Sequence, residues 1–260
     1  TGTGARSGFS CIITDVTPDI QLMFNGQCFP LKVFEKLDVN SSDLFALKNA
    51  EKNTENFAIT ANFVAEVRNR YGDEKSPDQI FYYIYGLLHS PDYRSLFENN
   101  LTKELPRIIL AKDFDLFFQA GLALSELHIN YETVKKFPID IEQGDLRLAH
   151  IENPSEFFRV DKMRFAKSGD KSKVIYNRNV TIQNIPPDAY DYFVNGKPAL
   201  EWVMEWQGVK TDKASGIVND ANDYANETMN NPAYPLELFQ RVITVSMETM
   251  KIVKSLPKLD

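Results

Sequence analysis

The clearest chemistry in this sequence is offered by a run of cations near the middle of the chain. Between residues 159 and 178 there are seven Lys or Arg residues against Asp161 and Asp170, a local charge of +5 in a chain of net charge −7. Lysine and arginine bind phosphate groups, and the planar fork of arginine can also bind the edge of a guanine. The run predicts a DNA-facing element made of Arg159, Lys162, Arg164, Lys167, Lys171, Lys173 and Arg178.

Aromatic residues are interleaved with these cations, at Phe157, Phe158, Phe165 and Tyr176. The same mixture is typical of a solvated hairpin with polar faces, and charge alone does not separate the two interpretations. Most nucleic-acid-binding modules have a basic balance, so the acidic total argues against a free-standing DNA-binding protein. It fits better a module that binds DNA together with a basic partner domain, because local patches set the local field.

A second polar stretch, residues 209–224, is rich in Asn, Asp, Ser and Lys around Gly216. Its chemistry is hydrogen bonding on a loop with a glycine that permits unusual backbone angles. The spacing of its acidic and amide residues does not fit a calcium loop. The stretch predicts a structural clamp, and a phosphate contact through Lys210 and Lys213 is the alternative.

Motifs for catalysis are missing from the sequence. It contains no G-K-[ST] phosphate loop, no zinc-ligand spacing and no nucleophile elbow, and its three histidines are scattered. Residues 231–234, Asn-Pro-Ala-Tyr, are similar to the Asn-Pro-Pro-Tyr motif of adenine methyltransferases, but one residue differs and no buried strand precedes them. The sequence predicts no catalytic residue, no metal site and no bound cofactor in this chain.

The elements that must position these residues are mostly helices. A helix is predicted to begin after Ser76, which forms a capping box with Gln79, and Pro77 suits its first position. Apolar residues follow at helical spacing as far as His89. A second helix is predicted from Pro91 towards Leu105, and a third over about 113–130. A closing helix over about 235–256 is apolar on two sides, which predicts that most of it is buried.

Strands are predicted towards both ends of the helical centre. Residues 9–14, 20–24 and 27–31 are rich in β-formers, with Asn25-Gly26 as a hairpin signal, and residues 35–56 predict a long surface loop. Pro138, Gly144, Pro154 and Gly169 break the helical pattern further on. The predicted fold class is α+β, with an N-terminal hairpin and helical lobe over 1–137. A mixed α/β DNA-recognition lobe with the closing helix follows over 138–260.

Composition is that of an ordinary globular protein. The chain has 260 residues, of which 43% are hydrophobic and 25% charged, and its apolar runs are too short to span a bilayer. Two cysteines, Cys11 and Cys28, predict a reducing compartment without a disulfide framework. The start carries neither a methionine nor an apolar leader, which predicts a piece of a longer chain without a signal peptide.

Several segments, in order, resemble one known family. Residues 80–94 read IFYYIYGLLHSPDYR, followed by LPRI at 105–108 and LSELHINYE at 124–132. Residues 18–20 and 26–30, residues 195–202 and, most specifically, residues 209–224 extend the match. Together they resemble the C-terminal target-recognition region of type ISP restriction-modification enzymes, with gaps at 35–56 and 138–173.

The resemblance implies a function that the residues alone do not. Type ISP enzymes join a nuclease, a helicase-like ATPase, an adenine-N6 DNA methyltransferase and this region in one polypeptide. The chain is then expected to recognise a specific site on double-stranded DNA and to position the adjoining methyltransferase domain on its adenine. It would not be an enzyme itself. S-adenosylmethionine, ATP and Mg are expected only in the intact, cytoplasmic enzyme of a bacterium or archaeon. The alternative is a coupling module that joins the methyltransferase to the motor without reading DNA.

Overall fold

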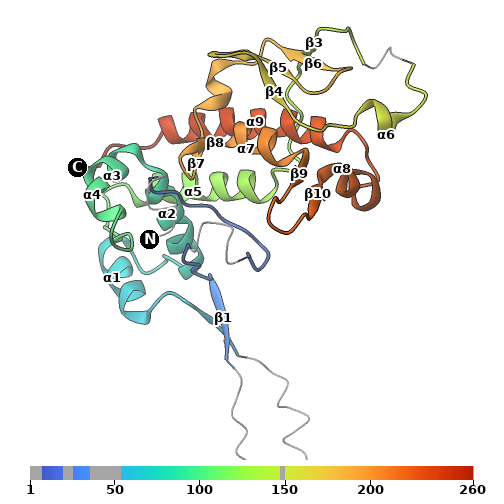
Figure 1. The fold of residues 1–260 in the computed structure, drawn as a ribbon. Helices are drawn as coiled ribbons and strands as arrows, with labels where there is room; N and C mark the ends of the chain where they lie inside the picture. Colours follow the sequence, from blue (N-terminus) through green and yellow to red (C-terminus); the bar gives the residue numbers. More distant parts are fainter. Residues whose placement is uncertain (1–7, 20–25, 36–53, 147–149, 260) are drawn as a thin grey trace, which may run out of the picture. The chain divides into compact units, whose positions relative to one another are not determined.

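The computed structural model describes residues 8–19, 26–35, 54–146 and 150–259 (Figure 1). Helices and small antiparallel sheets alternate along the chain, which confirms the predicted α+β class. Two compact units are present, and most of the first is residues 17–125, whereas most of the second is residues 126–255. The change from one unit to the other falls between Ser125 and Glu126, inside a helix. The predicted division at 137/138 into functional lobes stays a prediction.

The first unit is built mainly from helices α1 (Ala61–Tyr71), α2 (Pro77–His89), α3 (Pro91–Leu96), α4 (Glu98–Leu101) and the first part of α5 (Phe114–Ile129). The capping box at the start of α2 is confirmed, because Ser76 and Gln79 bond to each other's backbone N–H. The predicted single helix from Pro91 towards Leu105 is wrong. The chain leaves helical geometry at Phe97 (φ −107°, ψ 15°), so two short helices form instead.

Helices α2 and α5 approach each other through two glycines. A Cβ at Gly86 would overlap the carbonyl oxygen of Phe117, and one at Gly121 would overlap that of Tyr82. Beside this contact, the rings of Tyr83 and Phe114 stack with their centroids 4.5 Å apart, and both side chains are buried. The Tyr83 hydroxyl donates to the Ile109 carbonyl oxygen at 2.6 Å, so its polar end is satisfied.

The N-terminal β-structure differs from the prediction. Residues 8–14 and 26–30 form no strand, and residues 20–25, which include the first arm of the predicted hairpin, lie outside the described residues. The strands present are β1 (Lys32–Glu35) and β2 (Thr54–Phe57), which pair antiparallel. Since β2 occupies the last residues of the predicted 35–56 loop, the loop prediction is wrong there, and residues 36–53 lie outside the described residues.

The second unit holds a four-stranded antiparallel sheet in the order β3-β6-β5-β4. Its strands are β3 (Asp140–Ile141), β4 (Arg164–Lys167), β5 (Asp170–Ile175) and β6 (Thr181–Gln183). Two small hairpins follow, β7 (Phe193–Val194) with β8 (Lys197–Pro198) and β9 (Val209–Thr211) with β10 (Val218–Asp220). Between these strands lie the helices α6 (Pro154–Phe157), η2 (Pro187–Tyr190) and α7 (Ala199–Trp206), and after β10 come α8 (Ala221–Asp223) and η3 (Tyr224–Thr228).

The closing helix α9 (Tyr234–Lys254) organises the core of this unit. It packs against α7 and η2, and α7 lies beside it in Figure 1. Phe239 and Ile243 are fully buried on it, as are Val174 and Ile182 from the sheet. The predicted burial of the closing helix is therefore confirmed. Among the described residues, no helix has the length and apolar character needed to cross a membrane.

Candidate nucleic-acid interface

The predicted basic run forms the hairpin β4–β5 and the irregular segment before it. Arg164 pairs with Ile175 and Phe165 with Val174, and a register shift between Phe165 and Lys167 interrupts the ladder. Side chains of a strand alternate between its faces, so Met163 (3% exposed) and Phe165 face the core while the cations on either side are exposed. The hairpin thus separates an apolar face from a polar one.

Most cations of the run are paired with carboxylates from elsewhere in the unit. Arg159 contacts Asp220 at 2.7 Å and Asp161 at 3.5 Å. The other three pairs are Lys171–Glu201 (2.6 Å), Lys173–Glu142 (2.7 Å) and Arg178–Glu156 (2.8 Å). Four of the seven cations therefore have a partner outside the run. The local charge of +5 overstates the positive field, because the sequence count omits these four carboxylates.

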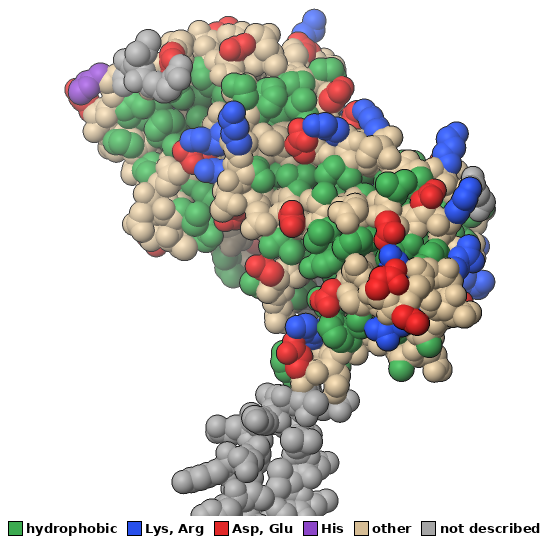
Figure 2. Space-filling model, turned by 180° about the vertical axis from the view of Figure 1, so that it is seen from behind, with side chains coloured by type: hydrophobic (Ala, Val, Ile, Leu, Met, Phe, Trp, Pro, Cys, Tyr) green, Lys and Arg blue, Asp and Glu red, His purple; other side chains and the backbone are tan. Residues whose placement is uncertain are grey.

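Three cations of the run have no ion pair within the described part of the chain: Lys162, Arg164 and Lys167. All three are exposed, and they lie on β4 or just before it. We call these three residues the unpaired stripe. On the face drawn in Figure 2, basic and acidic side chains are interspersed, and the coloured side chains form no large area of one sign there. The face drawn in Figure 2 therefore carries no broad basic surface.

The two remaining predicted residues lie on the β9–β10 hairpin. The Lys210 ammonium group is 3.1 Å from Glu205 and 3.8 Å from the centre of the Trp206 ring, so it is already engaged. Lys213 is exposed at the hairpin tip, where no described carboxylate pairs with it. Asp212 fixes the tip, because its Oδ1 accepts from the backbone N–H of Ala214 and Ser215 and from the Ser215 hydroxyl. The Ser215 bonds hold the pKa of Asp212 below its usual value.

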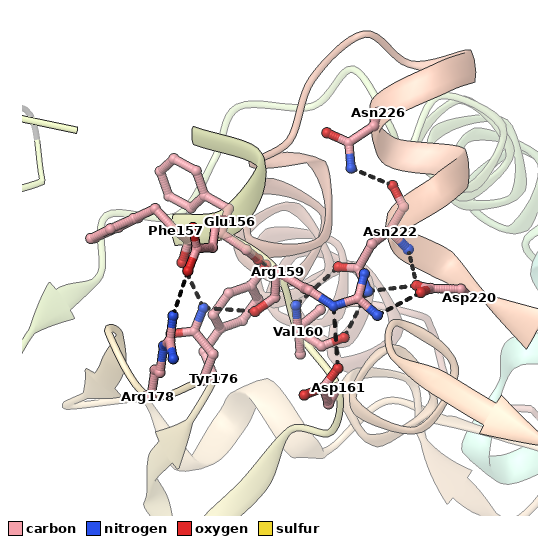
Figure 3. A network of polar contacts seen from close by, with 12 residues as sticks. Glu156, Phe157, Arg159, Val160, Asp161, Tyr176, Arg178, Asp220, Asn222 and Asn226 are labelled. Atoms are coloured by element: carbon pink, nitrogen blue, oxygen red, sulfur yellow. Dashed lines mark hydrogen bonds and ion pairs between the residues drawn. The ribbon is translucent and has the colours of Figure 1, made fainter. Parts of the chain in front are cut away.

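Residues 157–161, which we call the clamped segment, precede the stripe. Except for the end of α6 this segment is irregular, yet all five of its carbonyl oxygens accept hydrogen bonds from outside it. Figure 3 shows part of this network. The donors are Asn177 and Asn179 to Phe157, Tyr176 to Phe158, Asn177 to Arg159, Asn222 to Val160, and the Val209 N–H to Asp161, at 2.7–3.0 Å. Buried backbone groups need partners, and here side chains replace the ladder of a regular element.

Asp220 connects the clamped segment to the β9–β10 hairpin. One of its oxygens accepts from Arg159, and the other accepts from the backbone and side-chain amides of Asn222. Burial raises the pKa of Asp220, but the bonds from Arg159 and Asn222 outweigh that effect and hold it below its usual value. Gly208 lies against the same segment, because a Cβ there would be 2.6 Å from the Asp161 carbonyl oxygen.

The sequence predicted a structural role for residues 209–224, but it did not show which side chains hold another part of the backbone. Asn222 is 3% exposed and bonds to both the N–H and the C=O of Val160, at 2.9 Å each. Asn177 was missed as well, although its side chain bonds to two carbonyl oxygens and two backbone N–H groups. The available signal was the clustering of asparagines in 177–179 and 219–226.

Comparison with known proteins identifies the family to which the chain is similar. The family model for the Type ISP C-terminal specificity domain matches residues 1–238. The solved structure of the ATP-dependent Type ISP restriction-modification enzyme LlaBIII bound to DNA is 34% identical, with a TM-score of 0.80 over 100% of this chain. A nuclease-deletion mutant of the Type ISP enzyme LlaGI, in complex with a DNA substrate mimic, is 39% identical over 80% of this chain, with a TM-score of 0.64.

A third similar structure is the DrdV–DNA complex, at 27% identity and a TM-score of 0.75 over 100% of this chain. This chain spans only 15% of the LlaBIII and LlaGI chains and 24% of the DrdV chain. The comparison with curated proteins gives no match. Because the family model covers nearly all of the sequence and two Type ISP structures share its fold at over 30% identity, the chain belongs to the Type ISP C-terminal specificity domain family.

Proposed function

We propose that this chain recognises a specific site on double-stranded DNA through the unpaired stripe on β4. The support is the exposed position of Arg164 and Lys167 on the edge strand β4 and of Lys162 just before it, where none of the three forms an ion pair among the described residues. Similar structures at 27–39% identity are complexes with DNA or a DNA mimic. Arg164 is the proposed base reader, because its fork can bind a guanine edge, and Lys213 is a proposed phosphate contact.

The binding test compares two triple variants of the full-length protein on a labelled duplex. Replacing the unpaired stripe with alanine should weaken binding strongly and lower the slope of log affinity against log salt by about 2–3, since each lost phosphate contact removes about 0.9. The matched control replaces Lys171, Lys173 and Arg178, which have carboxylate partners, and should change the slope less. Equal losses in the two variants would contradict the assignment to β4.

Site choice is tested separately, on a library of randomised sites. Arg164→Ala should relax the preferred sequence by about 1–3 kcal/mol of discrimination at one position, whereas Lys213→Ala should weaken all sequences about equally. Arg178 carries the same planar fork, but its bond to Glu156 makes it the weaker candidate for the base reader. If Lys213→Ala changes the preferred sequence and Arg164→Ala does not, the two roles are reversed.

The remaining functions of the longer protein follow from the family. We propose that an adjoining methyltransferase uses S-adenosylmethionine, that a motor uses ATP and Mg, and that the whole acts in the cytoplasm. This chain itself transfers no methyl group in the proposal. A methyl-transfer assay on the chain alone, with S-adenosylmethionine and DNA, should give no turnover, and turnover would overturn that part.

One observation favours the second candidate, a module that couples neighbouring domains. Trp206, Ile217 and Val218 are 57–60% exposed on α7 and the β9–β10 hairpin. Exposed apolar groups of this kind are common at contacts with protein. If the full-length protein binds DNA and the stripe variant binds it equally well, while Ile217→Asp uncouples ATP hydrolysis from DNA, the coupling function is favoured.

A further inference from the structure

We propose that Asn222 is a positioning residue for DNA recognition, because its side-chain amide fixes the backbone from which the unpaired stripe starts. The inference rests on the proposed function and adds to it a residue that touches no DNA. Asn222 lies on α8, and the backbone that it holds belongs to Val160, 62 residues away in the sequence.

The first step is the geometry of the contact. Asn222 Oδ1 accepts from the Val160 N–H at 2.9 Å, and Nδ2 donates to the Val160 carbonyl oxygen at 2.9 Å. One side chain thus holds both polar groups of one residue, so a rotation of the backbone at Val160 breaks at least one bond. The Val160 side chain is fully buried and Asn222 is 3% exposed, which means that water cannot replace a broken bond easily.

The second step is that Asn222 is itself held. Asp220 Oδ1 accepts from its backbone N–H at 2.9 Å and from Nδ2 at 2.6 Å, and Asn226 donates to its carbonyl oxygen at 2.7 Å (Figure 3). An aspartate at this position would lose the donors to Val160 and Asp220 and add a second carboxylate beside the first. The chemistry of the site therefore selects an amide side chain.

The clamped segment leads directly into the residues proposed to contact DNA. Lys162 follows Val160 by two residues and Arg164 is the first residue of β4, so the orientation of the clamped segment carries into the stripe. Reading a base edge requires a narrow range of positions, whereas attraction to phosphates tolerates small displacements. Loss of Asn222 should thus affect sequence choice more than general affinity for DNA.

The experiment uses the full-length protein with Asn222→Ala and, as a matched control, Asn231→Ala. Asn231 lies in the same unit, and its side chain accepts from the Ala233 N–H, outside the network that holds Asn222 and the five clamped residues. Each variant is measured for preference across a library of randomised duplexes, for affinity to one random duplex at fixed salt, and for thermal unfolding. If Asn222→Ala does not fold, Asn222→Ser, which removes the amide but keeps a small polar side chain and adds no charge beside Asp220, replaces it.

We expect Asn222→Ala to lose about tenfold in preference for the best site, comparable to one lost base contact, while its affinity for the random duplex stays within about twofold. Asn231→Ala should behave like the wild type in both. Unchanged preference in Asn222→Ala, equal loss for all duplexes, or the same loss of preference in Asn231→Ala would overturn the proposal. A wild-type protein without salt-dependent DNA binding would overturn the proposed function as well, so the two failures are distinguishable.

Discussion

In the first unit, helices α2 and α5 touch through the bare backbone at Gly86 and Gly121, whereas in the second unit side chains hold the backbone of residues 157–161. Both arrangements fix a backbone, but by different means. The helices satisfy their own hydrogen bonds and need only space to approach, while the clamped segment depends on four side chains from two other places in the sequence. The helix contact should therefore be destabilised by substitutions that enlarge a side chain, and the clamped segment by substitutions that remove a hydrogen-bonding side chain.

The largest effect is expected where atoms are added to the helix contact. Gly121→Val places a side chain against the Tyr82 carbonyl oxygen, a backbone atom that cannot move alone, and should lower the free energy of unfolding by about 3 kcal/mol. Ala123→Val on the exposed face of the same helix is the control and should cost roughly 0.5 kcal/mol. Urea denaturation of both variants measures the difference, and similar values would remove the basis of the comparison.

Acid should weaken the second unit through a histidine on α5. Burial lowers the pKa of His128 to about 4 from a usual value near 6.5, and its Nε2 lies 2.8 Å from the Thr249 hydroxyl. The unfolded chain takes up the proton first, so the stabilisation is present above pH 6.5 and is lost as the pH falls to about 4. The loss should be about 2–3 kcal/mol.

The measurement is the free energy of unfolding between pH 7 and pH 4 for the wild type and His128→Gln. The variant keeps a polar side chain that does not titrate, so its curve should be flatter between pH 6.5 and pH 5. Parallel curves would show that the protonation of His128 does not contribute to acid unfolding.

Removing the side chains that hold the clamped segment should lower the free energy of unfolding in proportion to the hydrogen bonds lost. Asn177→Ala removes bonds to the carbonyl oxygens of Phe157 and Arg159 and to two backbone N–H groups, and should cost about 2 kcal/mol. Asn179→Ala removes only one side-chain bond, to the Phe157 carbonyl oxygen, and should cost about 1 kcal/mol. Thermal unfolding ranks the two, and the reverse order would show that the bonds of Asn177 are not what holds the segment.

The smallest effect is expected at the rim of the second unit. Arg178 and Glu156 form an ion pair with side chains 75% and 63% exposed, so Glu156→Gln should change stability by less than about 0.5 kcal/mol. The same change releases Arg178 and should raise affinity for a random duplex about two- to fivefold at low salt. Glu248→Gln, which releases Lys251 on α9, is the control for added positive charge. Equal gains in both variants would mean that the location of the released cation does not matter.

Elements that depend on neighbouring residues in the sequence were predicted better than elements that need a distant partner. The capping box at Ser76 and the closing helix depend on residues close together in the sequence, and both were predicted correctly. Residues 9–14 have the composition of a strand, but no strand in the described part of the chain pairs with them, and composition does not supply a partner. The predicted helix after Pro91 ignored the break at Phe97, which no proline or glycine marks.

The candidate site was predictable in the same uneven way. The basic run could be read from charge, with a hairpin as one of the two interpretations left open, and the polar stretch around Gly216 could be read from composition. The carboxylates that pair with four of the cations come from residues 142, 156, 201 and 220, which only the fold brings near. The bonds from Asn222 to Val160 also span 62 residues, so local pattern could not assign them.

These internal ion pairs have a consequence for how a DNA-reading surface searches a genome. Attraction to random sequence is almost entirely electrostatic, and the time that a protein dwells at each wrong position grows with the number of phosphates that it neutralises. Under the proposed function, a surface on which Arg159, Lys171, Lys173 and Arg178 already have partners, with three cations of the run left over, would dwell briefly at wrong positions. The carboxylates would then set how fast the surface moves along DNA, and the few side chains that reach a base would set where it stops.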